Sequence, residues 1–184
     1  TPSSLATLPA SPTPLLLPDP SLPISERIVY YYFVAVEENP LPEGSVVIMP
    51  DTYILAPTRS DIPYSTDTAA DLKTALEAVL NDRRNGWESG NLEIVDVTFG
   101  NGHTDVVLQG EYFGVGDITL IAARMQIIMT VFANTSVQTA TVTLNGDTIG
   151  NIGVSNSMDA RPADYVFTRS EIETFMNENA YGSP

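Results

Sequence analysis

Cysteine is absent from this chain of 184 residues, and histidine and lysine occur once each, as His103 and Lys73. Without cysteine there are no disulfides, no thiolate nucleophile and no zinc site built on thiolates. A Ser-His-Asp arrangement would have to use His103, but this residue follows a Gly-Asn-Gly turn, and we interpret it as a solvated turn residue. No lysine follows the glycine-rich segments 100–102 and 114–116, so they do not indicate a nucleotide site.

Basic residues are also scarce, with 8 Lys and Arg against 23 Asp and Glu and a formal net charge of -15. Phosphate backbones and anionic membrane surfaces are bound through clustered cations, so nucleic acid is excluded as a partner. The acidic segments lack the alternating oxygen ligands and closing Glu of a calcium loop. We therefore predict no catalytic site, no metal and no other cofactor.

Long apolar runs are missing as well. The longest, IAARMQIIMTVF at 121–132, is well below the roughly 20 residues that a membrane-spanning helix needs. Membrane attachment is therefore expected only through an anchor outside this chain.

Proline is abundant in one region, because residues 1–23 contain half of the chain's 14 prolines, mixed with Ser and Thr. Proline fixes φ and removes a backbone donor, so we interpret residues 1–24 as a disordered stalk. It is either simply a disordered end or a spacer that holds the domain away from a membrane or wall. Residues 25–184 are long enough for one domain, which we predict to carry a C-terminal helical extension.

Hydrophobic patterning predicts several strands within this domain. The segments 91–99 and 103–110 are joined by the Gly-Asn-Gly turn and predict a β-hairpin. Pro57 lies in one of the other segments and favours an edge strand or a strand end there. The remaining strands are expected at 27–37, 45–49, 52–59 and 136–144, the last closed by Asn145-Gly146.

Three helices are predicted between and after the strands, at 68–82, 117–134 and 168–180. The first begins with Thr68 and Asp71 in capping-box spacing, the second with Asp117 as N-cap, and the third with Thr168 and Glu171 in the same capping spacing. The order of elements predicts an α+β fold, in which a mixed, mostly antiparallel sheet packs with two to three helices.

Arg124 interrupts the most apolar helix. On a helical wheel it points nearly opposite to the narrow polar face of Thr119, Gln126 and Thr130. Its permanent charge then requires a buried carboxylate, a set of backbone carbonyls, a path to the surface, or a ligand. We favour a structural role, with an acid of the predicted hairpin as partner: Glu93, Asp96 or Asp105.

The succession of TAADLKTALEAVL, two strands with a Gly turn, and ARMQIIMTVFANTSVQTATVTLNG resembles the GerMN domain, named from a spore germination protein and found in bacterial envelope lipoproteins. In that family a Gln-apolar-apolar-x-Thr helix, here Gln126 to Thr130, leads into a strand that ends in a Gly turn. YILAPTR is similar to the family's strand that ends in a basic residue, here Arg59. Arg59, Arg124, Gln126 and Thr130 are therefore candidate structural or interaction residues.

The resemblance implies a fold similar to the ring-building modules of envelope secretion machines, with no established catalytic residues. It implies a non-enzymatic interaction or assembly module, extracytoplasmic and membrane-anchored or secreted, that binds a protein partner or itself in the bacterial cell envelope. An alternative is a small-ligand-binding or hydrolytic envelope protein with a pocket between the sheet and the C-terminal segment.

Overall fold

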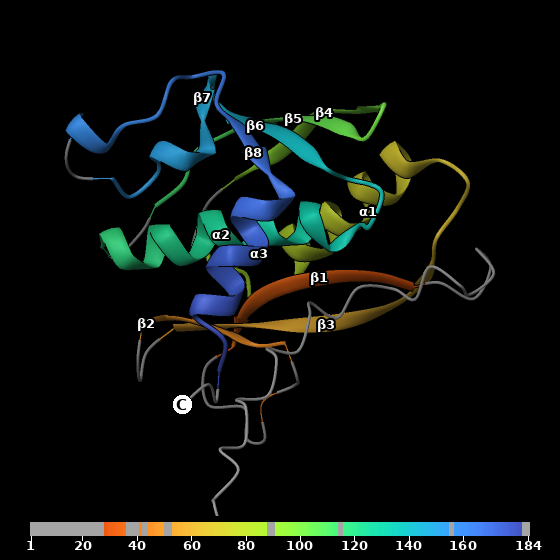
Figure 1. Ribbon diagram of the computed structural model, residues 1–184, viewed down its shortest axis with the longest axis horizontal. Coiled ribbons are helices and arrows are strands. Elements are labelled where there is room, and N and C mark those ends of the chain that lie inside the picture. Colours follow the sequence, from red (N-terminus) through yellow and green to blue (C-terminus); the bar gives the residue numbers. More distant parts are fainter. Residues whose placement is uncertain are drawn as a thin grey trace, which may run out of the picture.

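The computed structural model describes residues 28–35, 41, 44–49, 53–87, 91–113, 116–154 and 157–181, with backbone only for 28–35 and 59–62. The expected stalk at residues 1–24 lies outside this part. The described elements form three layers, in which helices lie between a three-stranded and a five-stranded sheet (Figure 1). The predicted α+β class is confirmed, and its sheet is divided into two.

The three-stranded sheet consists of β1 (Ile28–Ala35), β2 (Val46–Met49) and β3 (Tyr53–Pro63), in the antiparallel order β1-β3-β2. The prediction that Pro57 marks an edge strand or a strand end is wrong, because β3 is the central strand. However, β2 pairs with β3 only as far as Leu55, whereas Pro57 lies opposite Tyr32 of β1. Proline is tolerated there because, among the described strands, only β1 pairs with that part of β3.

The five-stranded sheet begins with the predicted hairpin, which is confirmed as β4 (Glu93–Gly100) and β5 (His103–Gln109). Its turn residues Asn101 and Gly102 have φ of 53° and 79°, the pair of positive values that a type I′ turn requires. The parallel partner of β5 is β6 (Thr139–Leu144), which continues through a second Asn-Gly turn into β7 (Asp147–Thr148). The short strand β8 (Val166–Thr168), which the sequence pattern did not predict, pairs with β6.

The helices are α1 (Thr68–Asn81), α2 (Asp117–Ala133) and α3 (Arg169–Glu178). The predicted cap of α3 is confirmed, since the Thr168 hydroxyl accepts from the N–H of Glu171 at 3.2 Å. The other two caps differ from prediction. Asp67 caps α1 by accepting from the N–H of Ala70 at 3.1 Å, and Gly116 is the N-cap of α2. Both helices thus have a cap one residue before the predicted one.

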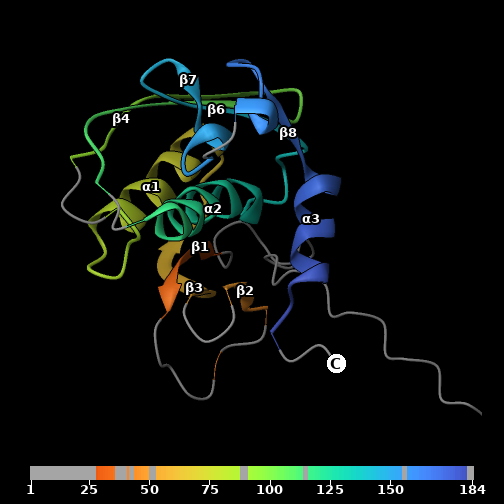
Figure 2. The ribbon, with the colours of Figure 1, turned by 90° about the vertical axis from the view of Figure 1, so that its left-hand side faces the viewer.

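The middle layer is formed by α1 and α2, which lie between the two sheets in both views (Figures 1 and 2). Because α2 is covered from two sides, a narrow apolar stripe would leave polar side chains facing one of the sheets. The sequence of α2 is instead apolar around most of the helix circumference. Its largest fully buried side chains are those of Ile127, Ile128, Met129 and Phe132.

The C-terminal segment joins the two sheets. It begins as β8 in the five-stranded sheet, continues as α3 beside α2, and ends against β2 of the three-stranded sheet (Figure 2). There the N–H of Val47 donates to the carbonyl of Asn179 at 2.8 Å, and the N–H of Tyr181 donates to the carbonyl of Ser45 at 2.9 Å. The predicted extension is therefore an integral part of the three-layer fold.

Phe175 of α3 provides a first prediction. Ile172 and Met176 on the same face are buried, whereas Phe175 is only half-buried. Phe175→Ala should therefore cost about 1 to 2 kcal/mol, less than the roughly 3 to 5 kcal/mol of a fully buried phenylalanine. The free energy of unfolding from urea titration measures this cost. A loss of 4 kcal/mol or more would show that the ring has a larger packing role than its exposure indicates.

Candidate functional site

Gln126 and Thr130 lie deep in the core. Gln126 has no exposed surface, and its Oε1 accepts a hydrogen bond from the N–H of Gly86 at 2.9 Å. The Thr130 hydroxyl donates to the carbonyl of Gln126 at 2.7 Å. Among the described side chains, Nε2 of Gln126 and Nε1 of Trp87 are buried donors without a hydrogen-bond partner. The predicted Gln-Thr pattern therefore serves packing, because a partner cannot reach these groups in the folded chain.

Arg59 lies in β3, opposite Tyr30 of β1. Only its backbone is among the described residues. The prediction that its side chain has a structural or interaction role lies outside the part of the chain that the structure describes.

Arg124 binds backbone carbonyls. Its Nη1 donates to the carbonyl oxygens of Gly150 at 2.7 Å and Ile152 at 2.8 Å. The carbonyl alternative is thus confirmed, and the preference for a hairpin acid is wrong, because Glu93, Asp96 and Asp105 are all exposed. The side chain meets the short helix η2 (Ile149–Asn151), which follows β7. Backbone carbonyls of the segment around η2 therefore accept from the guanidinium in place of a carboxylate.

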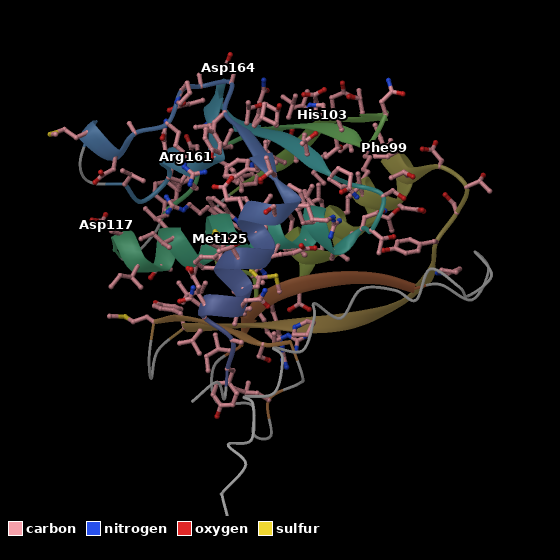
Figure 3. All side chains as sticks on the ribbon, viewed as in Figure 1. Phe99, His103, Asp117, Met125, Arg161 and Asp164 are labelled. Carbon is pink, nitrogen blue, oxygen red and sulfur yellow. The ribbon has the colours of Figure 1, made fainter. Side chains whose placement is uncertain are left out.

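A small cleft lies beside Arg124, between α2, α3, η2 and β8. We call it the arginine cleft; its volume is about 130 Å³. Two arginines, Arg124 and Arg161, line it together with Glu171. Met125 and Arg161, both labelled in Figure 3, mark its surroundings. Its apolar walls are formed by Ile121, Met125, Ile128, Phe167, Ile172 and Phe175.

Arg161 is held in place by several contacts. Its guanidinium carbon lies 4.2 Å from the centre of the Tyr165 ring, a cation–π distance, and its Nη1 forms an ion pair with Glu171 Oε1 at 3.0 Å. The Tyr165 hydroxyl donates to the same carboxylate, with its oxygen 3.0 and 3.1 Å from the two carboxylate oxygens. The side-chain amide of Asn151 also binds the backbone of Arg161: its Nδ2 donates to the carbonyl at 3.0 Å, and its Oδ1 accepts from the N–H at 2.8 Å. Glu171 is thus occupied by Arg161 and Tyr165.

The sequence pattern does not predict that Arg161, Tyr165 and Glu171 form one cluster. For Glu171 it predicts only the capping spacing to Thr168. The available signal was the short spacing of a cation, an aromatic ring and an acid between positions 161 and 171. Such spacing is too common in loops to predict a contact.

Burial and the neighbouring charge both act on Arg124. Removal from water lowers its pKa from the ordinary value, and the positive charge of Arg161 lowers this pKa further. Within the described residues, no carboxylate forms an ion pair with Arg124. The residues that line the arginine cleft thus carry two positive charges and one negative charge, which leaves one positive charge in a strongly acidic chain.

Tyr165 provides a prediction about pH. Its pKa is raised above the ordinary value, first by burial and second by its hydrogen bond to Glu171. The folded state therefore holds the phenolic proton more tightly than the unfolded chain. The resulting stabilisation is complete below the unfolded pKa of about 10 and is lost as the pH rises through the folded pKa.

Tyr165→Phe should consequently reduce the loss of stability between about pH 9 and pH 11. The measurement is urea unfolding at several pH values, with Tyr181→Phe as a control, because the Tyr181 ring is exposed. An identical pH profile for the wild type and Tyr165→Phe would contradict the assignment.

His103 differs from its predicted role as a solvated turn residue. It lies half-exposed on the outer face of β5, where Nδ1 is 2.8 Å from the hydroxyl of Thr139 and Nε2 is 3.2 Å from Asp105 Oδ1. The three side chains resemble a catalytic triad in composition only. They do not line the arginine cleft or either of the two cavities described next.

Two further cavities occur in the described part. One, of about 150 Å³, has polar walls at the N-terminus of α1 and includes the buried Asp71, whose Oδ1 accepts from the N–H of Ser65. The other, of about 280 Å³, lies at the end of the hairpin beside Glu93 and Glu111.

Within the described residues no cluster of three or more His, Cys, Asp or Glu is arranged for a metal ion. No described helix has the length and apolar content to cross a membrane.

Comparison with known proteins gave no relative. No protein-family model, no curated protein and no solved structure matches the chain. The element order α1-β4-β5-α2-β6, on which the GerMN resemblance is based, is present in the structure. Membership of that family remains a prediction.

Proposed function

We propose that this chain is a non-enzymatic interaction module that assembles through an exposed edge of its five-stranded sheet. The observation that carries this proposal is the position of β4, which is the outermost strand and pairs only with β5 among the described strands. Such an edge presents a row of backbone N–H and C=O groups that can pair with another strand.

The two halves of β4 differ. Near its start, a register shift between Ile94 and Asp96 and the charges of Glu93 and Asp96 protect the edge from pairing. Residues 97–100, Val-Thr-Phe-Gly, carry no charge. An antiparallel pair of two copies centred on 97–100 would place the acids of both copies outside the paired segment. We therefore propose a second copy of this chain as the first partner.

Cavity size supports an interaction module over an enzyme. The three cavities described above are all smaller than the roughly 300 to 1,000 Å³ that is usual for small-molecule sites.

The GerMN resemblance extends the proposal to the bacterial cell envelope, where the module would belong to an extracytoplasmic lipoprotein or secreted protein of sporulation or germination. The second candidate function is small-ligand binding, and the arginine cleft between α2 and the C-terminal segment favours it.

Light scattering tests the edge proposal. The net charge of -15 repels a second copy, so dimer formation should increase as the salt concentration is raised from about 10 mM to 0.5 M and the charges are screened. Thr98→Lys places a charge on the exposed edge strand and should reduce dimer formation at least tenfold.

Thr143→Lys is the matched control, because it changes the net charge equally but lies on β6, an interior strand of the same sheet. It should leave dimer formation within about twofold of the wild type, since an interior strand offers no free edge. A wild type that stays monomeric at every salt concentration would contradict the proposal, as would equal effects of the two variants.

A further inference from the structure

Arg124 keeps part of its binding capacity. A guanidinium carries five N–H donors, and the two hydrogen bonds to Gly150 and Ile152 both come from Nη1. The other nitrogens of Arg124 are not among the buried atoms without a partner, so they retain contact with solvent. Arg124 also lines the arginine cleft. The cleft thus contains a cation that the described carboxylates leave without an ion pair.

The apolar walls limit what can lie beside this cation. Ile121, Ile128 and Ile172 are aliphatic, and two phenylalanines and a methionine complete the apolar lining. A volume of about 130 Å³ corresponds to roughly four water-sized groups, at about 30 Å³ each. A branched alkyl group of three or four carbons fills this space, with its polar end at the guanidinium.

We propose that the arginine cleft binds a carboxylate that carries a short branched alkyl group. The planar guanidinium of Arg124 matches a carboxylate geometrically, and the alkyl group displaces water from the apolar walls. This chemistry occurs in a free branched-chain acid and in the C-terminal valine or leucine of a peptide. The inference rests on the second candidate function and is independent of strand pairing at β4.

The charges in the cleft favour a monoanion. Glu171 is bound by Arg161 and by the Tyr165 hydroxyl, so it does not neutralise Arg124. One added carboxylate balances the remaining positive charge, whereas a dianion would leave an excess negative charge beside Glu171. The bound carboxylate also reduces the electrostatic repulsion between the two positive charges of Arg124 and Arg161.

The binding test uses 3-methylbutanoate as the probe, with 3-methylbutanamide as its uncharged counterpart of the same shape. Titration calorimetry or NMR shift changes should give at least tenfold tighter binding of the acid than of the amide. Acetyl-alanyl-leucine with a free or an amidated C-terminus distinguishes a peptide end from a free acid. Octanoate should bind no more tightly than 3-methylbutanoate, because its tail exceeds the cleft.

A matched pair of variants at Ile121 tests the site without removing Arg124. Ile121 is half-buried on the cleft wall and precedes Arg124 by three residues, a spacing at which helical side chains meet. Ile121→Glu supplies an internal carboxylate to Arg124 and should weaken 3-methylbutanoate binding at least tenfold. Ile121→Gln has nearly the same shape without the charge and should weaken binding no more than about threefold. Circular dichroism confirms that both variants are folded.

Three results would overturn the inference: equal affinity for the acid and the amide, equal effects of Ile121→Glu and Ile121→Gln, or no binding of either probe at 10 mM. Tighter binding of the free leucine peptide than of 3-methylbutanoate would support the site and identify its source as a protein C-terminus. The dimer measurements on Thr98→Lys are unaffected by these outcomes, so failure of the cleft and failure of the strand edge can be told apart.

Discussion

Arg169→Ala is expected to destabilise the fold by about 3 to 5 kcal/mol, because the carbonyls of Phe132 and Val137 would lose their donor and that of Asn134 would keep only the N–H of Val137. Nε of Arg169 donates to Val137 O at 2.8 Å, and Nη2 donates to Phe132 O at 3.0 Å and Asn134 O at 2.6 Å. These carbonyls lie at and just after the C-terminus of α2, where helix carbonyls lack partners within the helix and a positive charge is favourable. The side chain is only 13% exposed, so water cannot replace it.

Urea unfolding measures the effect of Arg169→Ala, with Glu173→Gln as the control. Glu173 is 3.6 Å from Arg169 but its side chain is 44% exposed, so its loss should cost less than about 1 kcal/mol. Arg169→Lys should recover only part of the stability, since one ammonium cannot reproduce donors at both Nε and Nη2. If Glu173→Gln cost as much as Arg169→Ala, the ion pair, and not the carbonyl contacts, would be the important interaction.

The second large effect is expected for Arg124→Ala, at about 2 to 4 kcal/mol. Removing the side chain leaves the carbonyls of Gly150 and Ile152 without a donor and opens space beside α2. Arg124→Lys should recover part of the stability, because an ammonium can donate to carbonyls but the lysine side chain lacks the planar guanidinium. The free energy of unfolding is again the measured quantity.

Arg83→Ala is the control for Arg124→Ala, because it removes the same charge from an exposed position. Its expected effect is within about 0.5 kcal/mol of the wild type. Undiminished stability of Arg124→Ala, combined with loss of ligand or partner binding, would refute the structural role and leave recognition as the function of this residue.

Local signals in the sequence predicted much of the fold. The hairpin of β4 and β5 followed from Asn101-Gly102, since these two residues tolerate the positive φ values that the turn needs. The helices followed from apolar spacing, and the cap of α3 from Thr168 and Glu171. The cap of α1 was placed one residue late, because Asp67 and Thr68 are both good N-caps and the pattern does not separate them.

Features that depend on distant contacts were not predicted. The strand β8 has only three residues, which are too few to show an alternation of apolar and polar side chains. Its extended conformation is identified as a strand because it pairs with β6. The division into two sheets was also not predicted, because it depends on which strands pack on each side of α2 (Figure 1). The apolar sequence of α2 agrees with that position but equally fits a helix buried in any other way.

For the candidate site, the sequence alone determined that Arg124 carries a permanent charge, lies opposite the stripe of Gln126 and Thr130, and needs acceptors. Only the tertiary structure decided that the acceptors are the carbonyls of Gly150 and Ile152, and that Arg161 and Glu171 lie in the same cleft. The physical reason is that every residue carries a backbone carbonyl, so this kind of partner has no signature in the sequence. Packing of α2 between two sheets and against α3 determines which carbonyls come within reach.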